Sequence, residues 1–158
     1  MFLDGMSFLE EEREAWRPYE ALSDLSDEQL AVPVAAAHGW SGADLMAHML
    51  AWLEVSLEMA RELAVGESSP TLARIDAEWE AKGDGLNDEL LETYLALPRE
   101  ELRRRYATSP GELRGFLTVV PETRWVKHPQ HMESLVAETL EHYEEHLPDL
   151  EAILATSR

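Results

Sequence analysis

The segment from Ser41 to Gly66 constrains the fold more than any other part of the chain, because its apolar residues recur at intervals of three and four. That spacing places them on one face of an α-helix. Ser41 can cap the first turn with Asp44 at the third helical position, and Gly66 is a typical C-terminal stop. The inward face then carries Leu45, His48, Met49, Trp52, Val55, Ser56, Met59 and Leu63. We therefore predict one long helix here, with a histidine on its core-facing side.

Two further segments have helical periodicity of the same kind. The first covers residues 6–23, where Pro18 predicts a kink or a weak turn. A short helical turn capped by Ser26 follows it. The second covers residues 98–120, and the Ser109–Pro110 pair interrupts it. This second segment is predicted to be either one kinked helix or two helices separated by a break.

The last helix is predicted to run from about Met132 to Ala155, and Pro148 is expected to bend it. Its predicted core face consists of Val136, Leu140, Tyr143, Leu147, Leu150 and Leu154. An adjacent stripe carries Leu135, Thr139, His142 and His146. This helix therefore places two histidines beside its predicted core face.

The connection over residues 67–97 contains a proline, two glycines and helical pieces around Leu72–Trp79 and Leu86–Leu95. No convincing alternating pattern of a β-strand is present in the sequence. Short loops make neighbouring helices antiparallel, whereas a connection of this length lets the helices before and after it run parallel. We therefore predict an all-α fold, an up-down-down-up four-helix bundle with a long helical crossover between the second and third helices.

Composition favours a single acidic domain without disulfides. With 158 residues, of which 45% are hydrophobic, the chain can form one core but not two ordinary domains, so residues 1–158 are expected to be one domain. Cysteine is absent, which excludes disulfides and protein thiolates and suits the cytoplasm. The net charge of −19 repels phosphate backbones and anionic membranes, so nucleic acid is not an expected partner. Neither a secretory signal nor a membrane span is expected.

A pair of histidines, His142 and His146, is the strongest functional signal in the sequence. Residues four apart on a helix share a face, so both imidazoles can converge on one metal ion. A third ligand must come from another helix, and His48 is the natural candidate because it lies on an inward face. Trp52, one turn further along, would then wall one side of a pocket. Three imidazoles with the remaining coordination positions open are typical of a catalytic metal site.

The sequence pattern alone also allows structural explanations of these residues. Two histidines one turn apart in a glutamate-rich helix can simply be exposed, and His48 can be a hydrogen-bonded core histidine. Glu138, Glu141 and Glu145 either orient the imidazoles as neighbouring carboxylates or belong to a solvated face.

Other charged and histidine residues have weaker signals. His128 and His131 either line the mouth of a pocket or are incidental. The basic run Arg103–Arg105 either meets an anionic substrate or pairs with nearby acids, and pairing is the default expectation.

Two stretches of the chain resemble the DinB-like superfamily. The run 39–52 is similar to that group's W-S-x-x-D-L-x-A-H-x-x-x-W stretch, and the run 139–147 is similar to its closing H-Y-x-x-H. Asn87 and Trp125 also sit roughly where such proteins carry an asparagine and a tryptophan. Within the group, the chain looks most similar to the small DfsB-like members.

This resemblance implies an up-down-down-up four-helix bundle that is often dimeric. It implies a divalent metal ion (zinc, nickel, iron or manganese) at the positions of His48, His142 and His146. It also implies a low-molecular-weight thiol, because characterised members include thiol-dependent S-transferases and a thiol-dependent isomerase. The expected partners are therefore a small-molecule substrate and a second copy of the chain.

Three hypotheses follow. In the first, the chain is a metal-dependent thiol transferase, in which Arg124, Lys127 or His128 meets the carboxylates of the thiol; no catalytic residue is assigned. In the second, it is a non-catalytic metal- or ligand-binding stress-response bundle, in which the histidines stabilise the fold. In the third, the chain binds no metal.

Overall fold

Every regular element of the protein is helical within residues 2–157, the range that the computed structural model describes. The all-α prediction is confirmed. The elements are α1 (Gly5–Trp16), the 3₁₀ helix η1 (Arg17–Asp24), α2 (Asp27–Leu30), the 3₁₀ helix η2 (Ala35–Ala37), α3 (Gly42–Val65), α4 (Pro70–Lys82), α5 (Asp84–Leu95), α6 (Arg99–Val119), the 3₁₀ helix η3 (Glu122–Arg124), α7 (Pro129–Val136), the π-helical segment η4 (Ala137–Glu141) and α8 (His142–Thr156). No helix in this range has the length and apolar character that crossing a membrane requires.

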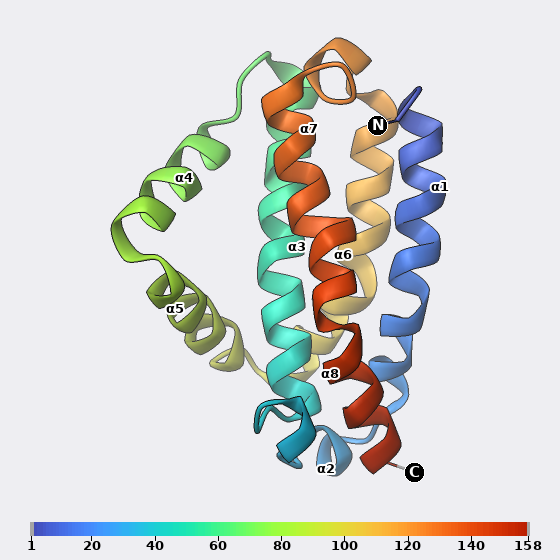
Figure 1. Cartoon of the computed structure of the whole chain (residues 1–158), viewed down its shortest axis with the longest axis vertical. Coiled ribbons are helices and arrows are strands. Elements are labelled where there is room, and N and C mark those ends of the chain that lie inside the picture. The colour runs from blue at the N-terminus through green and yellow to red at the C-terminus, as the bar shows by residue number, and fades with distance from the viewer. Residues whose placement is uncertain (1, 158) are drawn as a thin grey trace.

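Four long helical segments lie side by side: α1, α3, α6 and the continuous run α7–η4–α8 (Figure 1). Helix α3 contacts α6, η4 and α8, and α1 contacts the same three elements. Helices α3 and α6 run in one direction, and α1 and α7–α8 run in the opposite direction (Figure 1). The connecting helices α4 and α5 pack against α3 and return the chain to the start of α6. This return is what allows α3 and α6 to lie parallel.

Capping residues set the bounds of α3 as the sequence predicts. The Ser41 hydroxyl accepts a hydrogen bond from the backbone N–H of Asp44, and the Asp44 carboxylate accepts one from the N–H of Ser41. Gly66 is the C-terminal cap. At Gly42, a Cβ would lie 2.8 Å from the Leu30 side chain, so a residue without a side chain lets α2 pack closely against the start of α3.

The last helical segment differs from its prediction in two respects. It begins at Pro129, and it contains the π-helical segment directly before His142. A π-turn holds an extra residue, so it rotates the buried face relative to a regular helix. The predicted core residues Val136, Leu140, Leu147 and Leu154 are therefore only partly buried, whereas the adjacent stripe of Leu135, Thr139 and His142 is buried.

Prolines inside the other elements have the expected local effects. Helix α6 is one continuous helix that contains Pro110, so the alternative of a single helix is correct. Pro98 is its N-cap. Pro18 lies in η1, the 3₁₀ segment that replaces the α-helix after Trp16.

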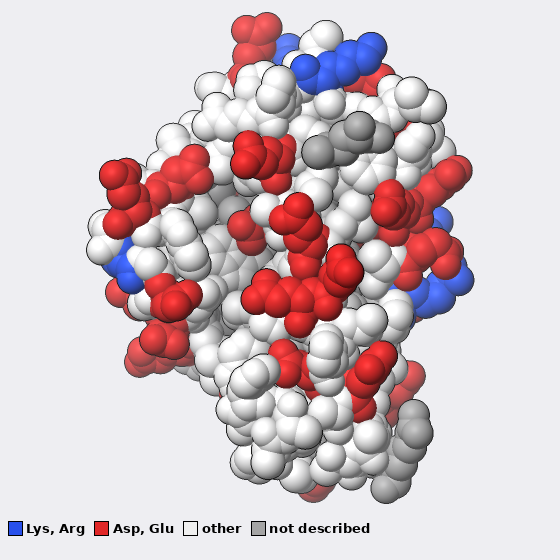
Figure 2. Space-filling model, viewed as in Figure 1, with Lys and Arg blue, Asp and Glu red and all other residues white. Residues whose placement is uncertain are grey.

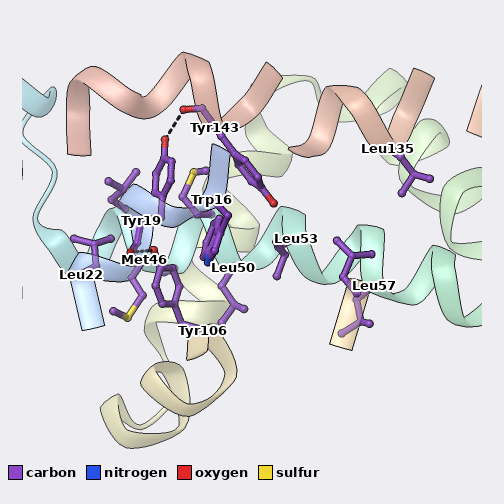
Figure 3. Packing of buried hydrophobic residues seen from close by; sticks show 14 of the residues in the cluster. Trp16, Tyr19, Leu22, Met46, Leu50, Leu53, Leu57, Tyr106, Leu135 and Tyr143 are labelled. Carbon is purple, nitrogen blue, oxygen red and sulfur yellow. Dashed lines mark hydrogen bonds between the residues drawn. The ribbon is translucent and has the colours of Figure 1, made fainter. Parts of the chain in front are cut away.

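An aromatic cluster in the core fixes α8 beside the histidine pair (Figure 3). Trp16 packs against Tyr19, Tyr106 and Tyr143 with ring centroids 5.1–5.2 Å apart. The Tyr19 hydroxyl donates to the backbone carbonyl of Tyr143, and the Tyr106 hydroxyl donates to that of Tyr19. Because Tyr143 follows His142 directly, this cluster sets the position of the histidine.

A buried ion pair supports the same turn of α8 from the other side. The carboxylate of Glu12 is 1% exposed, and Arg114 Nε lies 2.6 Å from it. The hydroxyl of Tyr143 donates to the same carboxylate over 3.0 Å. Elements α1, α6 and α8 are therefore joined at one buried charge.

Replacing Arg114 by Met should lower the free energy of unfolding by about 3–5 kcal/mol, because it leaves the Glu12 carboxylate buried without its cation. Urea denaturation measures the change. Arg104→Met is the matched control, because Arg104 pairs with Glu101 at the exposed surface and its loss should cost less than about 1 kcal/mol. Equal effects of the two substitutions would contradict the account of this ion pair.

Candidate metal centre

Three histidines from two helices meet at one point. Helix α3 contributes His48, and α8 contributes His142 and His146. The Nε2 atom of His48 lies 2.9 Å from Nε2 of His142 and 3.1 Å from Nε2 of His146. The candidate ligand atoms of all three lie within 4.8 Å of one another. The structure therefore brings together the three residues that the sequence nominated as a set.

These residues fit a metal ion in spacing and in protonation. Imidazole nitrogens bind a metal at ~2.0–2.1 Å, so nitrogens that share one ion lie roughly 3 Å apart. The Nε2 atom of His48 lies at such a distance from Nε2 of both His142 and His146. Burial, together with a smaller contribution from repulsion by His146, lowers the pKa of His48 to about 4. Burial also lowers the pKa of His142 to about 3, with help from the other two imidazoles. Both rings are neutral at pH 7 and can present the lone pairs that ligation requires.

A carboxylate that the sequence analysis missed orients His146. The Nδ1–H of His146 donates to Asp149 Oδ2 over 3.0 Å, which leaves the Nε2 lone pair facing the other histidines. Asp149 is 5% exposed. The spacing of three residues on one helix was the signal that could have identified it. The glutamates proposed for this role do not fill it, since Glu141 and Glu145 are exposed.

Asp149 also connects α8 to the loop that covers the histidines. Its Oδ1 atom accepts a hydrogen bond of 3.0 Å from Nδ1 of His38, a residue in the left-handed conformation with φ 59°. This loop presents Trp40, whose ring lies 4.9 Å from that of His48 and stacks on His146 at 5.7 Å. Sequence reasoning placed Trp40 only at the start of a helix. In the structure it shields two of the imidazoles from solvent.

His142 has a different environment. Its Nδ1 atom is buried and has no hydrogen-bond partner among the described residues. No second interaction therefore fixes its tautomer, and its orientation depends on the backbone. The π-helical segment Ala137–Glu141 ends directly before it, and π-turns of this kind are frequent at functional sites.

A cavity of about 550 Å³ opens beside the three histidines. It is lined by Trp40, His48, Trp52, Ile75, Asp76, Trp79, Asp84, Asn87, Ala137, Glu138, His142, Glu145 and His146. Trp52 lines this cavity, as predicted. Its indole N–H donates to the side-chain oxygen of Asn87 over 2.8 Å, which ties α5 to that wall. The connection α4–α5 thus supplies the outer side of the site.

Glu138 is an unusual carboxyl group in this cavity. Burial and, to a smaller extent, the neighbouring carboxylates of Asp76, Glu145 and Glu141 together raise its pKa to about 7. A group that titrates near neutral pH can both accept and release a proton under working conditions. Glu138 is therefore a candidate for proton transfer rather than for orienting a histidine.

Several other predicted site residues lie elsewhere. Arg124 donates to the backbone carbonyl of Leu63. Leu63 lies fifteen residues along α3 from His48, about 20 Å away at the helical rise. His128 caps α7, and neither it nor Lys127 lines the cavity. None of Arg124, Lys127 and His128 therefore lines the cavity, so the structure does not support the expectation that one of them meets the thiol.

The remaining sequence signals have structural explanations. Nδ1–H of His131 donates to the carbonyl of Arg124, so this buried histidine fixes the loop before α7. The basic run pairs with acids, as expected: Arg103 with Asp27, Arg104 with Glu101 and Arg105 with Glu54.

An all-helical fold with three converging histidines beside a cavity defines a class of helical protein able to bind a metal ion. The family model of the mycothiol maleylpyruvate isomerase N-terminal domain matches residues 9–144. The chain therefore belongs to that family, which is part of the DinB-like superfamily, and the predicted superfamily is confirmed. The finer resemblance to DfsB-like members stays a prediction. No curated protein and no solved structure matches the chain.

Glu138→Gln should stabilise the metal-free protein more at pH 8 than at pH 5. A carboxyl whose folded pKa is raised makes the protein less stable as the pH rises from its ordinary value to about 7, and Gln removes that ionisation. We expect the difference in unfolding free energy between variant and wild type to grow by about 2 kcal/mol over this range. Thermal melts after chelation measure it.

Glu133→Gln is the control, because it removes an exposed charge from the same continuous helical run and Glu133 is not among the neighbours that raise the pKa of Glu138. Its melting temperature should follow that of the wild type at both pH values. If Glu138→Gln did the same, the raised pKa of Glu138 would be contradicted.

Proposed function

We propose that the chain is a metal-dependent enzyme that transfers a low-molecular-weight thiol to a small electrophile. His48, His142 and His146 hold one divalent ion, with zinc, nickel, iron and manganese as the candidates, because imidazole accepts several first-row metals. The observation that carries the proposal is the convergence of three histidine ligand atoms, from two buried residues and one partly buried residue, beside a cavity of substrate size.

The thiol comes from outside the chain, because the sequence contains no cysteine. The matching family is named for a mycothiol-dependent isomerase, so mycothiol is the thiol that we propose. A bound divalent ion supplies Lewis acidity, which lowers the pKa of a coordinated thiol.

The protein's own residues then have distinct tasks. Asp149 holds the tautomer and orientation of His146. Trp40 covers the histidines and excludes water from them. Glu138 accepts the proton that leaves the thiol as its sulfur bonds to the electrophilic carbon, and later returns it to the leaving group or the adduct.

We also propose an architecture and a setting for the protein. Residues 1–158 form a single domain, and its four long helical segments constitute an up-down-down-up four-helix bundle. The directions of these segments in Figure 1 support this assignment. The protein acts in the cytoplasm as a homodimer on small molecules and does not bind nucleic acid, which the net charge of −19 supports.

The test combines metal content with thiol binding, on protein purified without a polyhistidine tag. The wild type should contain one divalent ion per chain, and the visible spectrum of a cobalt-loaded sample should change when mycothiol is added. His142→Ala should weaken metal binding by more than about 100-fold, beyond the 10–100-fold typical of losing an outer partner. Transfer of mycothiol to a bimane electrophile measures turnover.

His131→Ala is the matched control, because His131 is a buried histidine of the same helical run that does not face the cluster. It should retain the metal and the response to thiol. Metal binding without any response to thiols would favour the non-catalytic stress-response bundle. Equal metal content in wild type and His142→Ala would exclude the proposed centre.

A further inference from the structure

The cavity has an acidic lining. Four carboxylates line it, those of Asp76, Asp84, Glu138 and Glu145, and no Lys or Arg among residues 2–157 does. When all four are ionised they outweigh the two positive charges of a divalent ion. Acidic side chains flank a hollow on this face of the molecule, and Lys and Arg lie mainly toward its margins (Figure 2).

The basic residues of α4 do not offset this charge. Arg74 pairs with Glu78 at 3.5 Å, and Lys82 pairs with Glu89 at 2.8 Å. Neither cation lines the cavity. An anionic ligand would therefore enter a negative potential without a charged partner, and this costs affinity and slows association.

Three tryptophan rings also line the cavity. Trp52 and Trp79 meet edge to face with centroids 6.1 Å apart, and Trp40 lies over the histidines. Trp79 is 45% exposed, so it offers an indole at the solvent side of the cavity. Tryptophan faces attract organic cations, and nearby carboxylates strengthen the attraction.

We propose that the electrophile taken by this cavity is an organic cation with a flat apolar body, and that carboxylate-bearing electrophiles are rejected. The reaction itself rests on the proposed function, whereas the charge preference belongs to the lining residues. The maleylpyruvate in the name of the matching family carries two carboxylates, so this chain would differ from such an enzyme in its substrate.

Three probes that share a phenyl ring and differ in charge test the preference: benzyltrimethylammonium, benzyl alcohol and benzoate. Quenching of tryptophan fluorescence measures their binding to metal-loaded and to metal-free protein, because a carboxylate can also bind the ion directly. The cation should bind at least about tenfold more tightly than benzoate in both forms, and benzyl alcohol should lie between them. Added salt should reduce the ratio of the two affinities.

The double variant Asp76→Asn with Asp84→Asn should reduce the cation-to-benzoate ratio to about threefold or less. Both residues are exposed at the cavity, so these substitutions leave the core intact. The control is Glu11→Gln with Glu20→Gln, which removes the same charge from exposed positions outside the cavity and should keep the wild-type ratio.

Two results would overturn the proposal: benzoate binding as tightly as the cation in metal-free protein, or a ratio that the double variant leaves unchanged. The proposed function fails separately. A preference for the cation without thiol transfer would contradict only the proposed reaction. Thiol transfer without a charge preference would contradict only the proposed substrate class.

Discussion

Three imidazoles held in contact between two helices, two of them buried, are the constraint on which the rest of this structure depends. Burial keeps His48 and His142 neutral, and their Nε2 lone pairs point toward a common centre. Such an arrangement persists only if other contacts hold α8 in its place beside α3. The aromatic cluster around Trp16 and the buried Glu12–Arg114 pair join α8 to α1 and α6 at Tyr143, next to His142. Helix α3 packs in turn against α6.

The connection between α3 and α6 serves two purposes at once. It lets these two helices run parallel, and it places α4 and α5 beside the histidines as the outer wall of a cavity. The tryptophan, asparagine and carboxylates of that wall come from this segment, as Trp79, Asn87, Asp76 and Asp84 show. Two of the four long segments thus carry the candidate metal ligands, and the α4–α5 connection forms the wall past which a small molecule would reach them.

Much of the fold and of the histidine cluster could be predicted from sequence, because helical periodicity and a one-turn spacing are local signals. Capping at Ser41 and the convergence of His142 and His146 are of this kind. The role of Asp149 depends on which face of α8 is buried, and the π-helical segment rotates that face without an obvious sequence signature. The suggested role of Arg124 rested on its charge and its position in the sequence, whereas its contact with Leu63, far along α3 from His48, decides where it lies.

The electrostatics of the site connect these observations to chemistry. A three-histidine cluster in which burial keeps His48 and His142 neutral suits a divalent ion, and a carboxyl group with a pKa near 7 in the same cavity can move a proton. The chain has no cysteine, so the thiol of the proposed reaction would have to come from outside the chain.

X-ray absorption on zinc-loaded protein without a polyhistidine tag tests the central claim most directly. The account predicts a first shell that contains three imidazole nitrogens at ~2.0–2.1 Å. A first shell made of oxygen ligands, or one with fewer than three imidazoles, would contradict it.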